Sequence, residues 1–107
     1  MSDWRDPIHP GEQLAEELKE IEMNGHELAK RIGLPYGRIY EILRCERSVT
    51  ASTALRLGKF FGTGPEIWLN LQKEYDLEVA REKERDGLKA IKPLKWSRAK
   101  SLSPSRG

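Results

Sequence analysis

Two short helical patterns separated by a proline turn constrain the fold of this chain more than any other feature. Both lie in residues 24–43, NGHELAKRIGLPYGRIYEIL, where apolar residues recur three to four positions apart on either side of the break: Leu28, Ala29, Ile32, Ile39, Ile42 and Leu43. Gly33 is placed to end the first helix, and Pro35 disfavours helix at Leu34 while it suits the first turn of the second. Each helix is only roughly two turns long, so its narrow apolar stripe must pack against neighbours. The stretch therefore predicts a helix-turn-helix unit.

Glycine, proline and capping residues divide the whole chain into five expected helices. No stretch shows the sustained alternation of apolar and polar residues that strands require, so the predicted fold class is all-α. The apolar side of the fourth helix is expected to include Leu55. The expected helices run from about Pro10 to Met23, from an Asn24 cap to Gly33, from Pro35 into the Arg-rich stretch, from a Thr50 cap to Gly62, and from a cap at Thr63 or Gly64 to Gly87.

Length places these helices in one domain, which is followed by a basic tail. A chain of 107 residues fits one domain with a modest core, and we assign it to residues 1–86. Residues 87–107 hold six basic and no acidic residues and are expected to be disordered in isolation, unless their apolar side chains pack against the body or a partner: Leu88, Ile91, Leu94 and Trp96.

Cysteine usage and hydropathy indicate the compartment. Cys45 is the single cysteine, which excludes an intramolecular disulfide. The first residues, MSDWRDPIHP, lack the basic start and apolar run of a signal peptide, and no apolar stretch approaches the roughly 20 residues that span a bilayer. We therefore expect a cytoplasmic protein with no membrane association.

Charge is distributed unevenly along the chain. The total is +2, but residues 1–29 carry −6, residues 30–59 carry +5, residues 60–86 carry −3 and residues 87–107 carry +6. Separate acidic and basic blocks favour more than one charged partner, although solvated charge without a function remains the alternative.

The helix-turn-helix segment resembles that of lambda-repressor-like regulators, in which a Leu-Ala pair and a branched apolar residue lock the helix crossing. Leu28, Ala29, Gly33 and Ile39 stand at the matching positions. IHPGE near the start, RIYEIL, and VTASTALRLGKFFGTGPEIWLNLQKEYDLEVA over residues 49–80 resemble the HigA family of antitoxins, also called virulence-associated protein I. This resemblance implies a five-helix domain that dimerises, represses its own operon and neutralises a RelE-like ribonuclease toxin.

Three positions depart from the pattern of that family. Tyr40 stands where Asn is frequent, Gly64 where Ser is frequent, and Cys45 where a Gly commonly closes the helix. The change at Tyr40 means that the operator sequence does not follow from relatives. If the turn keeps its usual shape, Cys45 is expected to be mildly strained at a positive φ.

The second helix of the unit is expected to read DNA in the major groove. Its N-terminal residues would meet base edges, where an arginine can donate two hydrogen bonds to guanine and a glutamate can accept from cytosine. The candidates for base contact are Tyr36, Gly37, Arg38, Tyr40 and Glu41. Phosphate contact is expected from Arg44 and Arg47, and from the helix N-terminus capped by Asn24.

These residues also have alternative roles that need no DNA. The two tyrosines can cover the edge of the core. Arg44 and Arg47 can be solvated or paired with Glu41 and Glu46, and exposed pairs of this kind contribute only about 0 to 1 kcal/mol.

The fifth and first helices supply the candidate protein contacts. Trp68, Leu71 and Tyr75 form an apolar stripe that we assign to a homodimer interface, with the core as the alternative. Glu12, Glu16 and Glu20 share one face of the first helix, and a basic toxin would be drawn to this acidic block.

The predicted function is an antitoxin that binds double-stranded operator DNA, and two other functions are alternatives to it. A stand-alone helix-turn-helix repressor without a toxin would carry the same residues. A small metal-dependent enzyme would use Glu12, Glu16 and Glu20, but a flexible surface stripe without histidine is usually only solvated. His9 and His26 lack metal-ligand companions at useful spacing, so neither a metal, nor a cofactor, nor catalysis is predicted.

Overall fold

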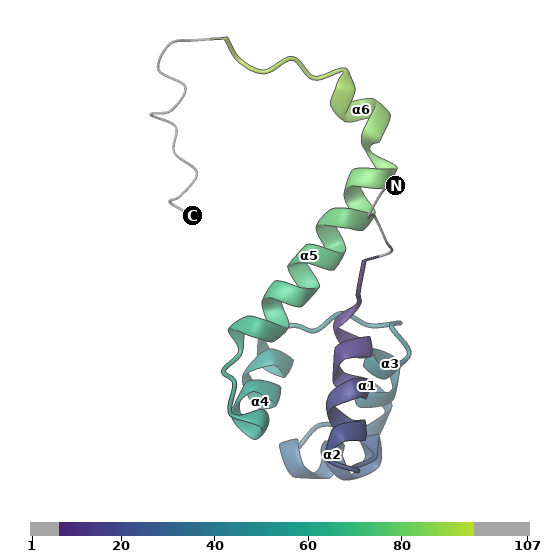
Figure 1. The fold of residues 1–107 in the computed structure, drawn as a ribbon, viewed down its shortest axis with the longest axis vertical. Helices are drawn as coiled ribbons and strands as arrows, with labels where there is room; N and C mark the ends of the chain where they lie inside the picture. The colour runs from purple at the N-terminus through teal and green to yellow at the C-terminus, as the bar shows by residue number, and fades with distance from the viewer. Residues whose placement is uncertain (1–6, 96–107) are drawn as a thin grey trace.

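The computed structural model describes residues 7–95, and within them the chain forms six helices and no strand. The all-helical prediction is confirmed, whereas the expected number of five is one too few for this part of the chain. Figure 1 shows the first helices of the chain gathered into a body, from which a longer helix projects. The helices are α1 (Pro10–Glu20), α2 (Gly25–Ile32), α3 (Tyr36–Leu43), α4 (Ala51–Phe61), α5 (Glu66–Lys83) and α6 (Arg85–Lys89).

Local capping residues set the ends of α2 and α4 where the sequence predicts them. The Asn24 Oδ1 accepts a hydrogen bond from the Glu27 backbone N–H at 2.8 Å, and α2 ends at Gly33 with a φ of 71°. Likewise Thr50 caps α4, and Gly62 ends it with a φ of 75°. A left-handed residue at a helix end favours glycine because a Cβ is strained there.

Three predicted boundaries are wrong. Helix α1 ends at Glu20 instead of Met23, because the chain turns through a positive φ at Glu22 and the Met23 N–H donates to the Leu18 carbonyl. Helix α5 begins at Glu66 without a side-chain cap, since the Thr63 hydroxyl donates to the neighbouring Gly64 carbonyl. At its other end α5 stops at Lys83.

The predicted border between domain and tail falls inside a helix. Gly87 was expected to end the fifth helix, but it lies within α6. The side chains of Leu88 in α6 and of Ile91 and Leu94 beyond it are exposed and therefore do not pack against the body. The rest of the predicted tail, residues 96–107 with Trp96, lies outside the described residues, as do residues 1–6.

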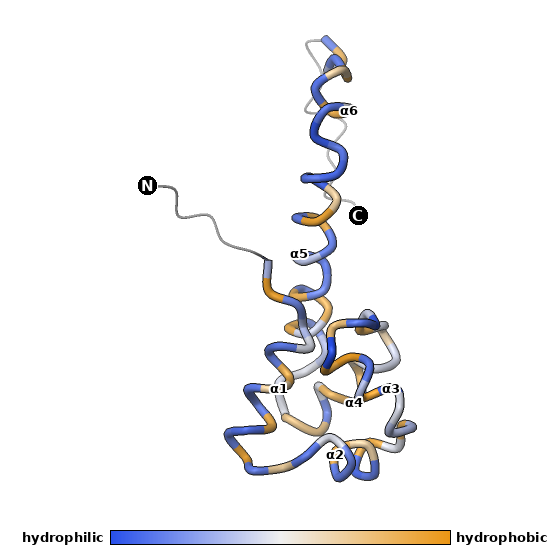
Figure 2. Tube along the Cα trace, turned by 90° about the vertical axis from the view of Figure 1, so that its right-hand side faces the viewer, coloured by the Kyte–Doolittle hydropathy of each residue, from blue (hydrophilic) through white to orange (hydrophobic). Residues whose placement is uncertain are grey.

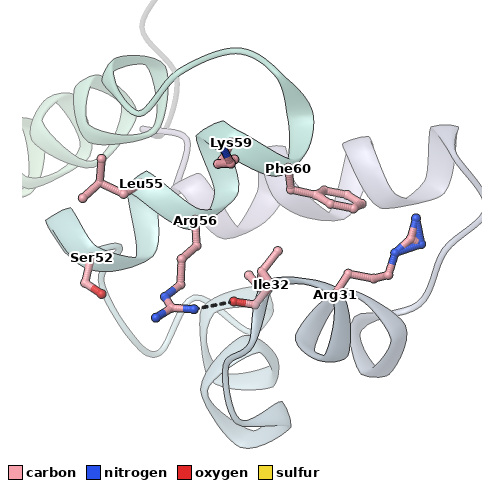
Figure 3. A pocket seen from close by; sticks show the side chains of 7 residues that line it. All are labelled: Arg31, Ile32, Ser52, Leu55, Arg56, Lys59 and Phe60. Atoms are coloured by element: carbon pink, nitrogen blue, oxygen red, sulfur yellow. Dashed lines mark hydrogen bonds between the residues drawn. The ribbon is translucent and has the colours of Figure 1, made fainter.

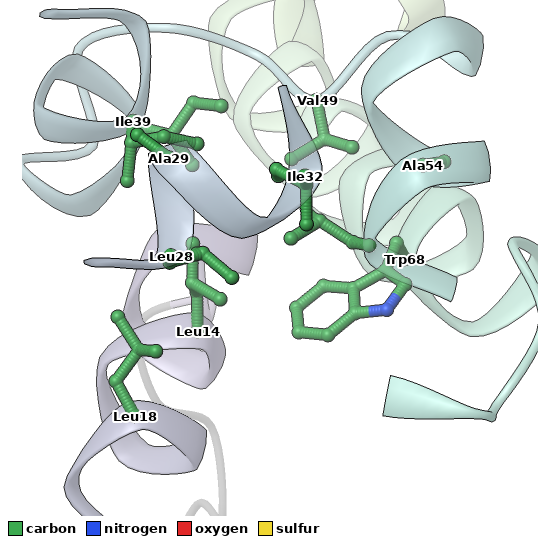
Figure 4. Packing of buried hydrophobic residues seen from close by; sticks show 11 residues of the cluster. Leu14, Leu18, Leu28, Ala29, Ile32, Ile39, Val49, Ala54 and Trp68 are labelled. Carbon is green, nitrogen blue, oxygen red and sulfur yellow. The ribbon is translucent and has the colours of Figure 1, made fainter. Parts of the chain in front are cut away.

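One core joins the first five helices (Figure 4). Each of them contributes at least one fully buried apolar side chain: Leu14, Leu28, Ile39, Ile42, Leu57 and Trp68. The prediction that Leu55 belongs to this core is wrong, because Leu55 is 59% exposed. It lies one residue past Ala54 and two before Leu57, so the helical turn carries it off the buried stripe.

Helix α5 starts within the body and extends out into the solvent. Its first turns pack against α1 and α4, and its later turns extend away from them (Figure 1). The hydropathy trace of Figure 2 is mostly hydrophilic along this projecting part. Within residues 7–95 no helix combines the length and the apolar composition that crossing a bilayer requires.

Candidate nucleic-acid interface

Contacts from the core and from α4 fix the angle between α2 and α3. Leu28 and Ile39 are fully buried in the seam between the two helices. The Leu34 N–H donates to the Ala29 carbonyl at 3.0 Å, which closes the turn after α2. From α4, the Arg56 guanidinium donates to the Ile32 carbonyl at 2.7 Å and so satisfies an otherwise unpaired carbonyl at the C-terminus of α2. The two helices are therefore held as one rigid unit.

The outer face of α3 carries most of the residues predicted to contact bases. Tyr36 and Tyr40 are 43% and 44% exposed, and a Cβ placed on Gly37 would meet no atom within 4 Å. Arg38 is half-buried and forms no ion pair with another described residue. This face offers a backbone open to close approach, two aromatic rings and an uncommitted cation.

Two predicted contact residues are engaged with each other. The Glu41 carboxylate accepts from the Arg47 guanidinium at 2.6 Å, and both side chains are about half exposed. Arg44 forms a similar pair with Glu46 at 3.1 Å. Exposed pairs contribute little to stability and exchange readily, so both arginines can turn from these partners to phosphate groups.

A row of stacked groups crosses from α2 onto α3. The rings of His26 and Tyr36 are 4.9 Å apart between centroids, those of Tyr36 and Tyr40 are 5.6 Å apart, and the Arg44 guanidinium lies 5.1 Å from the Tyr40 centroid. Sequence reasoning missed His26, because its contact with Tyr36 depends on the angle between α2 and α3.

The N-terminus of α2 lies next to this row. Since the Asn24 side chain accepts from the Glu27 N–H, the amides of Gly25 and His26 remain at the positive end of the helix dipole. Such amides bind phosphate oxygens. Asn24 would therefore contribute to phosphate binding only by capping α2, because its side-chain oxygen already accepts the Glu27 N–H.

Cys45 closes α3 in the strained conformation that the sequence predicts. Its φ is 62°, and its N–H donates to the Ile42 carbonyl at 2.9 Å. Burial, with a smaller effect from Glu12, raises the pKa of the thiol. The thiol is free and half-buried.

The predicted dimer residues do not share one environment. Trp68 is 2% exposed, which corrects its assignment to an interface, because a side chain buried within one chain offers almost no surface to a second. Leu71 is partly buried against the core, and the Tyr75 ring packs edge-on against His9 at 4.8 Å. Sequence reasoning missed the exposed apolar residues of α5, which are Ile67, Leu77 and Val79.

The three predicted toxin contacts lie on the outside of α1. Glu12, Glu16 and Glu20 are all exposed. No group of three or more His, Cys, Asp or Glu side chains within residues 7–95 is arranged to hold a metal ion.

A hollow of about 500 Å³ lies between α2 and α4, away from α3 (Figure 3). Two of its cations already have partners, since Arg31 lies over the Phe60 ring at 5.4 Å and Arg56 binds the Ile32 carbonyl. We therefore regard it as a seam that supports the α2–α3 unit. Its walls are formed by Arg31, Ile32, Ser52, Leu55, Arg56, Lys59 and Phe60.

The chain is similar to several known proteins of related description. No protein-family model matches the chain. Over 88 residues it is 47% identical to virulence-associated protein I of Dichelobacter nodosus, a match that covers 81% of each chain. A solved structure of an addiction module antidote protein of a HigA family from Coxiella burnetii is 50% identical, with a TM-score of 0.81 over 84% of this chain and 100% of that chain. The Pseudomonas aeruginosa antitoxin HigA, solved with the higBA promoter, is 36% identical, with a TM-score of 0.80 over 83% and 99%.

Proposed function

Because the chain belongs to the HigA family of helix-turn-helix antitoxins, we propose that it binds operator DNA as a dimer, represses its own operon and neutralises a RelE-like, mRNA-cleaving toxin. The family resemblance inferred from the sequence is confirmed. The observation that carries the DNA-binding part is the outer face of α3, where aromatic, cationic and glycine positions lie together on a helix fixed against α2.

The charge of α3 and its surroundings supports binding in the major groove. Residues 30–59 carry a net charge of +5, and phosphate neutralisation by Lys and Arg supplies much of the affinity of such proteins. Arg38, near the start of α3, would donate to a base edge, with Tyr36, Gly37 and Tyr40 beside it. Arg44 and Arg47 would contact phosphates once released from Glu46 and Glu41.

A dimer is part of this proposal because it would match a palindromic operator. Two recognition helices about 34 to 36 Å apart fit successive major grooves on one side of the duplex. Leu71 and Tyr75 remain the proposed contacts, and the exposed Val79, four residues after Tyr75, extends the same face of α5.

The proposed toxin-binding surface is the acidic face of α1. A ribonuclease needs basic residues to hold RNA phosphates, and Glu12, Glu16 and Glu20 offer it an exposed acidic face on α1. This face would leave α3 available for DNA.

The DNA-binding proposal is tested with two arginine variants and a fluorescent promoter duplex from upstream of the gene. We expect Arg44→Ala to weaken binding to all sequences about equally and to lower the salt slope by roughly one unit. Arg38→Ala should instead cost about 1 to 3 kcal/mol at one base step and relax the preference there.

The stoichiometry of the complex is a separate test. Two chains per palindromic duplex, measured by analytical ultracentrifugation, are expected. If both variants bound like the parent, the assignment of α3 to the groove would be wrong, and a single chain per duplex would contradict the dimer.

A further inference from the structure

The stacked row on α2 and α3 presents apolar ring surface where a recognition helix usually presents hydrogen-bonding groups. Tyr36 and Tyr40 are four residues apart, so they lie on one side of α3, one turn from each other. Their rings are inclined by only 29° and stack. Neither belongs to the buried core nor to the partly buried residues packed against it.

The neighbours of the two rings hold them in place. Gly25 lies beside Tyr36, since a Cβ at Gly25 would be in ordinary van der Waals contact with a Tyr36 ring carbon at 3.7 Å. The His26 ring packs against the Tyr36 ring with their centroids 4.9 Å apart, and the Arg44 guanidinium lies over Tyr40. Arg44 is itself paired with Glu46 at 3.1 Å. Rings held in this way lose little conformational entropy when they bind a partner.

We infer that Tyr36 and Tyr40 form an aromatic shelf that reads thymine methyl groups in the major groove. This inference rests on the proposed DNA-binding function and names the base chemistry that its recognition helix selects. Among the four bases only thymine carries a methyl group at the groove edge, while the others present polar atoms. Apolar contact between an aromatic ring and a methyl group is favourable, whereas a polar base edge that packs against the ring loses its water.

The two ends of the row fit this orientation. Arg44 lies at the C-terminal end of the shelf, where it would meet a phosphate and hold α3 at a fixed depth. His26 lies at the other end, next to the free amides of α2 that are suited to the phosphate of the facing strand. With both ends anchored, the rings between them would face neighbouring base pairs. The operator half-site is then expected to hold thymines at adjacent positions.

The test uses a duplex selected by the full-length protein from a random-sequence pool. We expect thymines in the selected half-site. Replacing each by deoxyuridine removes only the methyl group and leaves base pairing intact. Binding measured by fluorescence anisotropy should weaken about fourfold for each thymine that contacts the shelf, the change that corresponds to one buried methyl group.

Protein variants show which side chains cause this preference. Tyr40→Phe keeps the ring and should keep the ratio of thymine to uracil affinity at the contacted position. Tyr40→Ala should bring that ratio to one. Arg38→Ala is the matched control: it should weaken binding to both duplexes and leave the ratio unchanged, because its partner is a different base edge.

Three results would overturn the inference. If the parent protein bound thymine and uracil duplexes equally, or selected half-sites without thymine, the shelf would not read methyl groups, although the proposed DNA binding would stand. If no duplex were retained from the pool at any salt concentration, both the inference and the proposed function would fall.

Discussion

At the scale of single residues, His9 links the start of α1 to α5. Its Nδ1 accepts a hydrogen bond from the Gly11 N–H at 2.8 Å, and its ring packs edge-on against Tyr75. The acceptor role requires an unprotonated Nδ1. Burial lowers the pKa of His9, and the nearby charges of Glu12 and Asp76 oppose this effect without cancelling it.

The lowered pKa makes the stability of the fold depend on pH. The unfolded chain binds a proton at His9 near pH 6.5, whereas the folded chain resists it. The stabilisation of the folded state by neutral His9 is therefore complete above about pH 6.5. It is lost as the pH falls toward the lower pKa of His9 in the folded chain. We expect the free energy of unfolding, measured by urea titration at several pH values, to decrease across this window.

Two asparagine variants isolate the titrating group. In His9→Asn the side-chain oxygen can cap α1 without titrating, so the decrease below pH 6.5 should become smaller. His26→Asn changes an exposed histidine and should leave the decrease as it is. Equal slopes in the parent and in His9→Asn would show that other groups cause the dependence.

At the scale of elements, two glycines let helices approach more closely than any other residue would allow. A Cβ on Gly11 would lie 1.9 Å from the Ile42 carbonyl oxygen, at the contact between α1 and α3. A Cβ on Gly58 in α4 would lie 2.2 Å from the Gly64 backbone, just before α5. In both places the obstacle is main chain, so a rotamer change cannot relieve it.

Gly11→Ala and Gly37→Ala form a matched pair of substitutions in helices. We expect Gly11→Ala to reduce the free energy of unfolding by about 1 to 3 kcal/mol or more, because α1 must move away from α3. Gly37→Ala meets no neighbour and should increase it by about 0.5 to 1 kcal/mol, since alanine favours the helix. Urea denaturation measures both changes. A loss of less than about 0.5 kcal/mol in Gly11→Ala would mean that the helix contact adapts easily.

The elements that the sequence predicts well depend on neighbouring residues alone. Asn24, Gly33, Thr50 and Gly62 cap or end helices through contacts within one turn, so their signals are local. The break between α5 and α6 was missed because Gly87 gave a stronger local signal than Glu84, where the helix actually changes.

Contacts between distant segments could not be read in the same way. The Gln72 side chain accepts from the Val49 N–H at 2.8 Å and donates to Asp76 at 3.0 Å, which joins α5 to the segment before α4. Nothing near Gln72 in the sequence points to Val49. The burial of Trp68 is similar, since apolar spacing on α5 does not tell a core face from a dimer face until α1 and α4 are placed.

The candidate site was predictable where helix geometry alone determines a face. Tyr36, Gly37 and Tyr40 lie on the outside of α3 because Ile39 and Ile42 occupy its inside. The pairing of Glu41 with Arg47 was foreseen only as an alternative, because it depends on how the chain turns after Cys45. The stacking of His26 on Tyr36 requires the angle between two helices, which no residue pattern supplies.

At the scale of the whole molecule, opposite charges lie on different helices. The acidic face of α1 carries Glu12, Glu16 and Glu20, and the stacked row and its arginines lie on α2 and α3. Helix α1 packs against α3 through Gly11, so its exposed glutamates face away from that contact. The proposed contacts with a basic toxin and with DNA therefore lie on separate surfaces of the chain.

The charge-reversal variant Glu12→Lys, Glu16→Lys, Glu20→Lys tests this arrangement against the small basic protein expected from the adjacent reading frame. At low salt, where surface charge acts most strongly, its dissociation constant should rise about tenfold, from roughly 0.5 kcal/mol for each lost surface pair. The control Glu74→Lys, Glu82→Lys, Glu84→Lys makes the same change in net charge on exposed positions near the projecting part of the chain and should alter the constant much less. Circular dichroism checks that both variants fold. An unchanged dissociation constant in the α1 variant would place the toxin on another surface. If the parent protein bound no toxin at all, a stand-alone repressor would be favoured, because the proposed DNA binding through α3 does not depend on the acidic face of α1.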